Sequence, residues 1–200
     1  EREAWYREHA DGLDLEVRWW DEPFNYSRVN NVTARGARGE VLVFLNDDTV
    51  LVDPTWLREL VGWATRPDIG LVGLQLLDAD GRIQHGGVVV GVGSFADHLF
   101  PGMVPHTDTV FGSTDWYRNT LSVTAACVAV RRDLFDDVGG FDERFVLCGS
   151  DVVLGLDTRF AGYRNVCSPA VEVRHLESVT RGRDVPVGDF HASYWRYQKY

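Results

Sequence analysis

The sequence predicts an α/β protein whose mostly parallel central sheet is flanked by helices. Residues 41–45 are five consecutive apolar residues that run into the polar sequence Asn-Asp-Asp-Thr. An apolar run without polar alternation is typical of a strand that is covered on both faces, as the strands of parallel sheets are. Residues 53–64 combine helix-capping residues with apolar residues at helical spacing, and residues 69–77 form a second apolar run of strand length. The order is therefore strand, helix and strand around the Asn-Asp-Asp sequence.

The segment before the central strand is expected to contain three short elements. Residues 1–10 favour a charged helix, and residues 13–20 alternate apolar and polar residues as an edge or half-covered strand does. Ser27 can cap a further helix, which the glycines Gly36 and Gly39 end. That helix precedes the central strand.

The helix after the Asn-Asp-Asp sequence has well-marked ends, because Asp53 can cap it, Pro54 can take its first position and Pro67 stops it. In the second half of the chain, residues 94–116 are rich in Gly, Pro, His and Asp, and a loop of this length is usually functional or mobile. Residues 183–200 form a polar, basic and aromatic tail. Further strands are expected at residues 87–93, 121–131, 163–167 and 170–175, and helices at residues 132–138 and 151–161.

Length and composition limit the protein class. A chain of 200 residues with 44% hydrophobic and 25% charged residues suits one globular domain, residues 1–200. A formal net charge of −10 argues against nucleic acid as a partner, because it repels a phosphate backbone. No apolar run reaches the roughly 20 residues needed to span a bilayer, and the first residues do not resemble a signal peptide. The chain lacks an initiating Met, so we expect it to be a piece of a longer protein.

The cysteines indicate a reducing compartment. There are 3 of them, at positions 127, 148 and 167, without the close paired spacing of a zinc site. We therefore expect buried free thiols.

Asn46, Asp47 and Asp48 follow directly on the central strand. In open α/β sheets ligands bind at the carboxyl ends of the strands, and two adjacent carboxylates beside an amide suit Mg²⁺ or Mn²⁺. The same residue types are also ordinary loop and helix-cap chemistry. These residues alone leave both interpretations open.

Several further stretches occur in a recognisable order around this sequence. They are residues 24–31, 43–49, 53–57, 80–87, 123–127, 131–132, 139–143, 150–151, 161–164 and 175–178. Together they resemble the family-2 glycosyltransferases, and most of all the rhamnosyltransferase-like members that build bacterial surface polysaccharide. The resemblance covers most of residues 22–182.

The resemblance implies the GT-A fold, a Rossmann-like α/β domain that binds a nucleotide-diphosphate sugar together with Mg²⁺ or Mn²⁺. The acidic metal motif of the family matches residues 46–48, with an amide at its first position. Asp48 is then expected to ligate the metal and link it to the donor's phosphates, and Asn46 and Asp47 to act on the ribose, the sugar or a water. His175 matches a family histidine that completes the metal shell, although a lone histidine is more often a surface or core residue.

The catalytic carboxylate of the family matches Asp151. It is expected to act as general base on the acceptor hydroxyl, so that the oxygen attacks the anomeric carbon from the face opposite the phosphate. The alternative is a residue that simply stabilises a helix N-terminus. Thr124 and Ala125 match a backbone turn near the acceptor and the sugar. His85 and residues 97–98 lie in loops expected near the donor sugar, or are plain loop polar residues.

Two departures from the family pattern bear on this site. Val153 stands where a second acid usually follows the base, which puts the acceptor site in doubt. The two strands that hold the nucleotide base and ribose in the family do not occur before Leu13, so the fold is expected to be truncated at its N-terminus. A sheet without its first βαβ unit has an unpaired edge. We therefore expect either self-association through that edge or coverage of it by residues 1–20.

The leading hypothesis is an inverting, metal-dependent glycosyltransferase of bacterial surface polysaccharide synthesis that acts on a saccharide or lipid-linked acceptor. The resemblance implies a cytoplasmic location, peripheral at the inner face of the membrane. The alternative is a non-catalytic fragment or scaffold domain that keeps the fold without the chemistry. A metal-dependent phosphoesterase would need more converging Asp or His ligands than the motifs supply. Membrane contact of the tail through Trp195, Tyr197 and Tyr200 is opposed by the negative charge of the chain.

Overall fold

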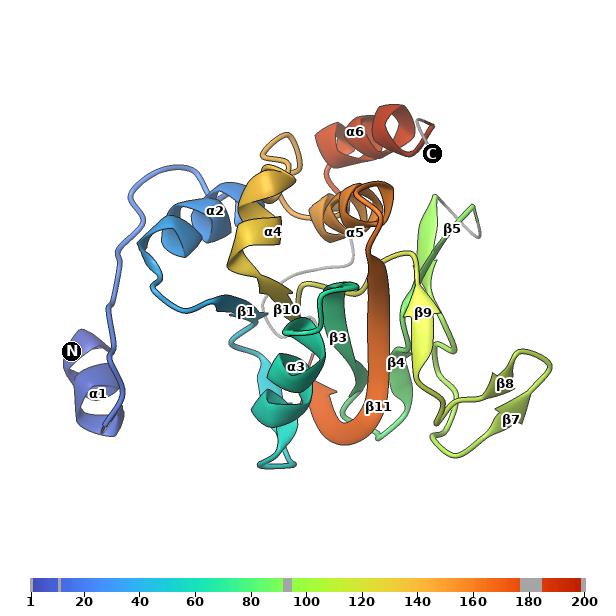
Figure 1. Ribbon diagram of the computed structural model, residues 1–200. Helices are drawn as coiled ribbons and strands as arrows, with labels where there is room; N and C mark the ends of the chain where they lie inside the picture. Colours follow the sequence, from blue (N-terminus) through green and yellow to red (C-terminus); the bar gives the residue numbers. More distant parts are fainter. Residues whose placement is uncertain (1, 11, 92–94, 177–184, 199–200) are drawn as a thin grey trace.

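The computed structural model of the chain describes residues 2–10, 12–91, 95–176 and 185–198. Its centre is a seven-stranded sheet with helices packed on both faces (Figure 1). The strands are β1 (Val41–Leu45), β2 (Thr49–Leu51), β3 (Ile69–Leu77), β4 (Ile83–His85), β9 (Arg118–Thr120), β10 (Cys127–Arg131) and β11 (Arg164–His175). The main order is β1-β10-β3-β11-β2, while β4 pairs with β3 and β9 pairs with β11. The predicted α/β class is confirmed.

The prediction of a mostly parallel sheet is wrong at the level of strand pairs. Among the described strands only β3 and β11 pair in parallel, and β10 is antiparallel to both β1 and β3. The long excursion of residues 78–126 leaves the carboxyl end of β3 and returns to the same edge. The chain therefore re-enters the sheet in the opposite direction. β1, β3 and β11 still point the same way, so their carboxyl ends meet at one edge.

Two apolar clusters hold the helices on opposite faces of this sheet. The helices are α1 (Arg2–His9), α2 (Tyr26–Gly36), α3 (Trp56–Ala64), α4 (Arg132–Asp137), α5 (Ser150–Phe160) and α6 (Val187–Tyr197). On one face α3 packs Leu60 and Ala64 against β3, β10 and β11. On the other face α2, α4 and α5 pack Ala34, Leu134 and Leu154 against β1, β3 and β10. None of the described helices is long and apolar enough to cross a membrane.

The position of β1 at the end of the sheet changes its burial. Only Leu42 and Phe44 are buried in β1, and Leu45 is exposed. The prediction of a strand covered on both faces is nevertheless confirmed for β1, because Leu42 and Phe44 lie in one apolar cluster and Val41 and Val43 are half-buried against the other. It is also right for β3, whose nine residues are all buried.

The caps of two helices differ from the sequence prediction. At α3 the N-cap is Thr55, which makes no side-chain cap hydrogen bond, and the predicted cap Asp53 accepts from the Thr55 N–H at 2.7 Å, two residues earlier. At α2 the cap is Asn25, whose side chain accepts from the Arg28 N–H at 2.8 Å. Ser27, the predicted cap, is buried and donates its hydroxyl to another segment.

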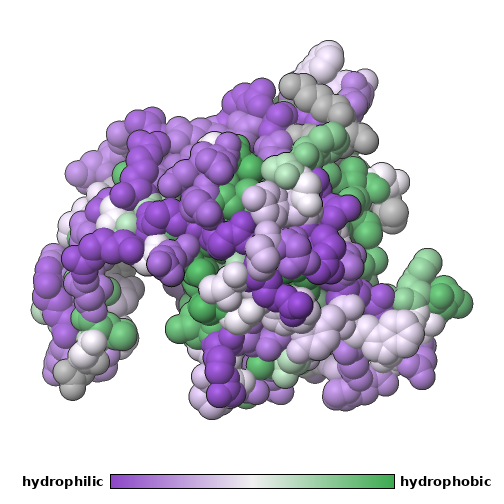
Figure 2. Space-filling view, viewed as in Figure 1, coloured by the Kyte–Doolittle hydropathy of each residue, from purple (hydrophilic) through white to green (hydrophobic). Residues whose placement is uncertain are grey.

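The excursion of residues 78–126 contains two small two-stranded sheets among its described residues. They pair β5 (Val88–Val90) with β6 (Ala96–His98) and β7 (Asp108–Thr109) with β8 (Gly112–Ser113). The β7–β8 hairpin projects from the body of the molecule, and Figure 2 shows an apolar patch at its tip. There Val110 is 94% and Phe111 74% exposed.

The described part of residues 1–20 adds no strand to the free edge of β1. Residues 13–20, predicted as a strand, form an irregular segment that contacts α2 through a hydrogen bond from Arg18 to the Val32 carbonyl. α1 lies to the side of the molecule, away from the other helices (Figure 1). Within the described residues β1 pairs with β10 alone. The expectation that residues 1–20 cover the free edge of β1 is therefore wrong as far as an added strand is concerned. Self-association through this edge stays a prediction.

Three smaller expectations have mixed outcomes. The two strands predicted at residues 163–175 are one strand, β11, with an irregularity between Ser168 and Val173. The tail folds into α6 over most of its length. Tyr200, residues 183–184 and the end of the strand predicted at residues 87–93 lie outside the described residues.

All three cysteines are free, as predicted. Cys127 and Cys167 are buried, and burial raises the pKa of both thiols to about 12. Cys148 is only half-buried. The two buried thiols are therefore neutral and unreactive near pH 7.

Candidate active site

Asn46, Asp48 and His175 lie together where β1 and β11 end. A tight turn follows β1, and β2 then pairs with the end of β11 so that Thr49 stands opposite His175. This pairing brings His175 Nε2 to 3.0 Å from Asp48 Oδ1 and to 3.5 Å from Asn46 Nδ2. Asp47 is exposed in the same turn. The predicted ligands Asp48 and His175 are thus adjacent in the structure.

Gln84 sets the orientation of the His175 ring. The Gln84 Oε1 atom lies 2.7 Å from His175 Nδ1, and its Nε2 donates to the His175 carbonyl at 3.4 Å. Because Oε1 can only accept, Nδ1 carries the proton of a neutral ring and Nε2 presents its lone pair toward Asp48. Asp48 Oδ1 is buried and receives no hydrogen bond from the described residues. With this neutral tautomer two acceptor atoms face each other, whereas a ring protonated on both nitrogens would form an ion pair with Asp48 at the same distance.

This pair of acceptors fits a divalent cation. Carboxylate oxygen and imidazole nitrogen are both metal ligands, and a cation between them would satisfy the orphaned Asp48 Oδ1. In the part of the chain that the structure describes, no group of three or more His, Cys, Asp or Glu side chains could hold a metal by itself. Mg²⁺ sites commonly combine one or two carboxylates with substrate phosphates. The pair therefore suits a cation shared with a phosphorylated ligand.

A short segment, residues 124–126, joins this pair to the other candidate groups. The Ala126 carbonyl accepts a hydrogen bond from the Asn46 N–H at 2.9 Å. The Thr124 N–H donates to His85 Nε2 at 3.3 Å, and the Ala125 N–H donates to Asp151 Oδ2 at 3.1 Å. The predicted residues from four different parts of the chain thus meet around one backbone segment.

Asp151 lies in the first turn of α5, where its Oδ1 accepts from the Val152 N–H at 2.8 Å. Its side chain is partly exposed, so the carboxylate is reachable from solvent. The Tyr26 hydroxyl donates to the Ala125 carbonyl at 3.1 Å. Burial, and next the negative charge of Asp151, raise the pKa of Tyr26 well above its usual range. Tyr26 is therefore a permanent hydrogen-bond donor beside the candidate base.

His85 supports the 124–126 segment from below the surface. It is 1% exposed, and its Nδ1 lies 2.7 Å from His98 Nδ1. Burial, followed by the neighbouring His98 and His175, holds the pKa of His85 well below its usual range. His85 is thus neutral, with Nε2 accepting from the Thr124 N–H and Nδ1–H donating to His98. The structure shows this contact with Thr124, while contact of His85 with a donor sugar stays a prediction.

Two residues of this arrangement were missed by sequence reasoning. Gln84 and Tyr26 both lie inside stretches that carry the resemblance, residues 80–87 and 24–31, which could have indicated them. Their partners, His175 and Ala125, are far away in the sequence. Val153 is 1% exposed within an apolar cluster, so the position of the second family acid is a core position here.

A hollow on the described surface lies elsewhere. It has a volume of about 530 Å³ and is lined by α2, α4, residues 138–144, and the Asp157 and Arg196 side chains. None of the predicted site residues lines it. The candidate site is instead a row of side chains along the sheet edge.

The chain is similar in sequence to a known family and to known proteins. A family model described as "Glycosyltransferase like family 2" matches residues 23–185. The O-antigen biosynthesis protein RfbC of Myxococcus xanthus is 50% identical over 182 residues, which are 90% of this chain and 14% of that protein. The uncharacterized protein y4gI of Sinorhizobium fredii is 43% identical over 180 residues, 87% of this chain and 20% of that protein. The chain therefore spans only a small part of the length of these relatives.

Solved structures share the fold at low sequence identity. GalNAc-T7 with UDP, GalNAc and Mn²⁺ superposes with a TM-score of 0.74 at 14% identity, over 99% of this chain and 40% of that one. The mannosyltransferase PcManGT of Pyrobaculum calidifontis, in complex with GDP-Man and Mn²⁺, superposes with a TM-score of 0.62 at 17% identity, over 98% of this chain and 58% of that one. These likenesses show the Rossmann-like GT-A fold. Because the family model spans most of the chain, the chain belongs to the glycosyltransferase-like family 2.

Proposed function

We propose that the chain transfers a sugar from a nucleotide-diphosphate sugar to an acceptor hydroxyl, with inversion and with Mg²⁺ or Mn²⁺ bound by Asp48 and His175. The observation that carries the proposal is the orphaned Asp48 Oδ1 facing His175 Nε2 at 3.0 Å. Two solved structures with this fold contain UDP or GDP-Man together with Mn²⁺, which supports this class of ligand.

The side chains at the metal pair have separate tasks in this proposal. A bound cation would neutralise charge on the departing nucleotide diphosphate. Gln84 keeps the Nε2 lone pair of His175 directed at the site through its 2.7 Å contact with Nδ1. Asn46 and the exposed Asp47 stand beside the pair and suit contacts to the ribose, the sugar or an ordered water.

Asp151 acts as the general base in this proposal. Its side chain is partly exposed and accepts from the Ala125 N–H, while the carbonyl of the next residue, Ala126, accepts from the Asn46 N–H. The base and the strand end that carries the metal pair are therefore attached to adjacent residues of the 124–126 segment. This arrangement suits attack by an acceptor oxygen from the face opposite the departing phosphate, which inverts the anomeric carbon.

The relatives support a proposal for the acceptor and the setting. The name of the Myxococcus relative concerns O-antigen, and an 87-residue match at 34% identity is to a Mycobacterium tuberculosis N-acetylglucosaminyl-diphospho-decaprenol L-rhamnosyltransferase. We infer a saccharide or lipid-linked acceptor in bacterial surface polysaccharide synthesis, at the cytoplasmic face of the membrane. We further infer self-association through the unpaired edge of β1, which light scattering tests: Leu45→Lys should reduce the particle size, and Val110→Asp at the hairpin tip should not.

The first test is calorimetric titration with UDP, GDP and dTDP, with and without Mn²⁺. We expect Mn²⁺-dependent binding of at least one nucleotide. Asp48→Ala should abolish it, because it removes the carboxylate ligand. Asp80→Ala, an exposed carboxylate in the turn before β4, is the matched control and should bind as the unaltered chain does. Binding that is independent of both Mn²⁺ and Asp48 would contradict the proposal.

A second candidate is a non-catalytic domain that keeps the fold. It is favoured by the apolar core position of Val153 and by the unpaired edge of β1. On this alternative Asp48→Ala and Asp151→Asn would both be silent in every binding and transfer assay.

A further inference from the structure

The segment that delivers Asp151 to the site has no regular structure of its own. It consists of residues 141–149, which connect the end of α4 to the start of α5, and we call it the approach segment. Its direction decides where Asp151 lies, because α5 begins at Ser150 immediately after it. Contacts from other elements must therefore hold it in place.

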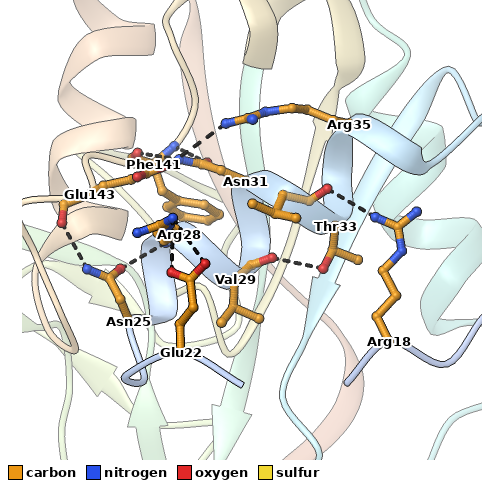
Figure 3. Close-up of polar contacts among 11 residues, drawn as sticks. Arg18, Glu22, Asn25, Arg28, Val29, Asn31, Thr33, Arg35, Phe141 and Glu143 are labelled. Atoms are coloured by element: carbon orange, nitrogen blue, oxygen red, sulfur yellow. Dashed lines mark hydrogen bonds and ion pairs between the residues drawn. The ribbon is translucent and has the colours of Figure 1, made fainter. Parts of the chain in front are cut away.

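α2 holds the first half of the approach segment (Figure 3). The Asn31 side chain donates to the Phe141 carbonyl at 2.8 Å and accepts from the Phe141 N–H at 2.9 Å. Asn25 Nδ2 donates to the Glu143 carbonyl at 2.9 Å, and Arg35 forms a long ion pair with the Glu143 carboxylate. The N-cap residue and one face of α2 thus hold the backbone of residues 141–143 by hydrogen bonds.

Asp189 on α6 holds the second half. It is 0% exposed, and its carboxylate accepts from three consecutive backbone groups: the Val146 N–H at 2.7 Å and the Leu147 and Cys148 N–H groups at 2.8 Å each. Both carboxylate oxygens are engaged by this segment. Hydrogen bonds from N–H groups to a carboxylate are about twice as strong as those between neutral groups.

The end of α6 reinforces the same geometry. Gly149 has a φ of 98°, and a Cβ at that position would meet the Phe145 ring and the Tyr197 hydroxyl at 2.9–3.0 Å. Arg196 pairs with Asp142 near the start of the approach segment at 3.4 Å and with Asp157 in α5 at 2.7 Å. α6 therefore contacts the approach segment near its start, in its second half and at Gly149, the residue before α5 begins.

We propose that Asp189 is a positioning residue for the candidate base. By binding the N–H groups of residues 146–148 it fixes the start of α5, and so keeps the Asp151 carboxylate on the Ala125 N–H. The assignment of Asp151 as base rests on the proposed function. The position of the Asp151 carboxylate on the Ala125 N–H does not depend on that function. Asp189 touches no reacting group in this proposal and acts only through the approach segment.

The test compares Asp189→Asn with Asp137→Asn by amide hydrogen exchange measured by NMR. An Asn amide keeps one accepting oxygen and turns its NH2 group toward the N–H groups that the other oxygen held, either Val146 or both Leu147 and Cys148, so exchange there should accelerate roughly tenfold or more. The Ala125 N–H should accelerate as well, because the Asp151 carboxylate leaves it. Asp137 is exposed at the end of α4, and its substitution by Asn should change neither region. Asp189→Glu keeps the charge and should give a smaller effect, which provides a folded variant if Asp189→Asn fails to fold.

A second readout measures transfer and nucleotide binding on the same variants. Asp189→Asn should lower kcat about a hundredfold, as expected of a misplaced base, while Mn²⁺-dependent nucleotide binding stays unchanged. Unchanged exchange at Ala125 would overturn the proposal, and so would unchanged kcat alongside accelerated exchange. If the unaltered chain binds no nucleotide and transfers no sugar, the proposed function fails, and the Ala125 exchange still decides whether Asp189 positions Asp151.

Discussion

Replacing Gln84 by Leu tests whether a single hydrogen bond keeps the metal pair open. Gln84 Oε1 holds the proton of His175 on Nδ1 at a distance of 2.7 Å. Without that acceptor the proton can move to Nε2, which lies 3.0 Å from Asp48 Oδ1. His175 would then donate to Asp48, and a cation would have to displace this new hydrogen bond. Residues that orient metal ligands in this way are worth about 10- to 100-fold in affinity, or about 1.4–2.7 kcal/mol.

The assay is calorimetric titration of Mn²⁺ in the presence of saturating UDP or GDP, whichever the unaltered chain binds. Gln84→Leu should weaken Mn²⁺ by that factor, while the metal-free free energy of unfolding changes by only about 1 kcal/mol because one hydrogen bond replaces another. Gln84→Glu, which keeps an acceptor at Nδ1, should bind Mn²⁺ at least as tightly as the unaltered chain. An Mn²⁺ affinity of Gln84→Leu within twofold of the unaltered chain would refute the reasoning, and so would an equal loss in Gln84→Glu.

Three further outcomes are expected. Asp151→Asn should lower the transfer rate about 10²- to 10⁴-fold and leave Mn²⁺-dependent nucleotide binding intact, and weakened binding in the same calorimetric assay would contradict its assignment as base. Gly155→Ala should lower the free energy of unfolding, measured in urea, by about 1–3 kcal/mol, because a Cβ there would meet the side chain and the Cα of Ser122 at 2.1–2.7 Å. Gly62→Ala is the control, because a Cβ at Gly62 would meet nothing within 4 Å. Stability should fall as pH rises between 9 and 12, because folding raises the thiol pKa of Cys127 and Cys167 from 9.0 to about 12, so that the unfolded chain binds fewer protons there. A Cys127→Ala/Cys167→Ala variant should show a shallower fall in urea unfolding over that range, and an identical slope would contradict the assignment.

Local sequence patterns were sufficient for the elements whose signals are contiguous. The apolar run at residues 69–77 becomes the fully buried β3, and the cap predicted at Asp53 placed the start of α3 to within a few residues. The Asn-Asp-Asp sequence was correctly placed at the end of a strand. These signals come from neighbouring residues, so a single strand or helix turn is enough to express them.

Strand direction was beyond local patterns. β10 reads as a buried strand in sequence, but its antiparallel place between β1 and β3 depends on where a long excursion returns to the sheet. The cap of α2 was misplaced by two residues for a related reason. Ser27 is engaged by the distant Phe145 carbonyl, which leaves Asn25 to cap the helix.

The sequence by itself determined the α/β class, the family and the residue types of the candidate site, because motifs of adjacent residues carry that information. Only the tertiary structure decided which of those residues meet. Pairing of β2 with β11 brings His175 to Asp48, the 124–126 segment connects Asn46 with Asp151, and α6 buries Asp189 against the approach segment. Each of these contacts joins residues far apart in the chain. Their proximity follows from how the sheet and helices pack, and no window of neighbouring residues encodes it.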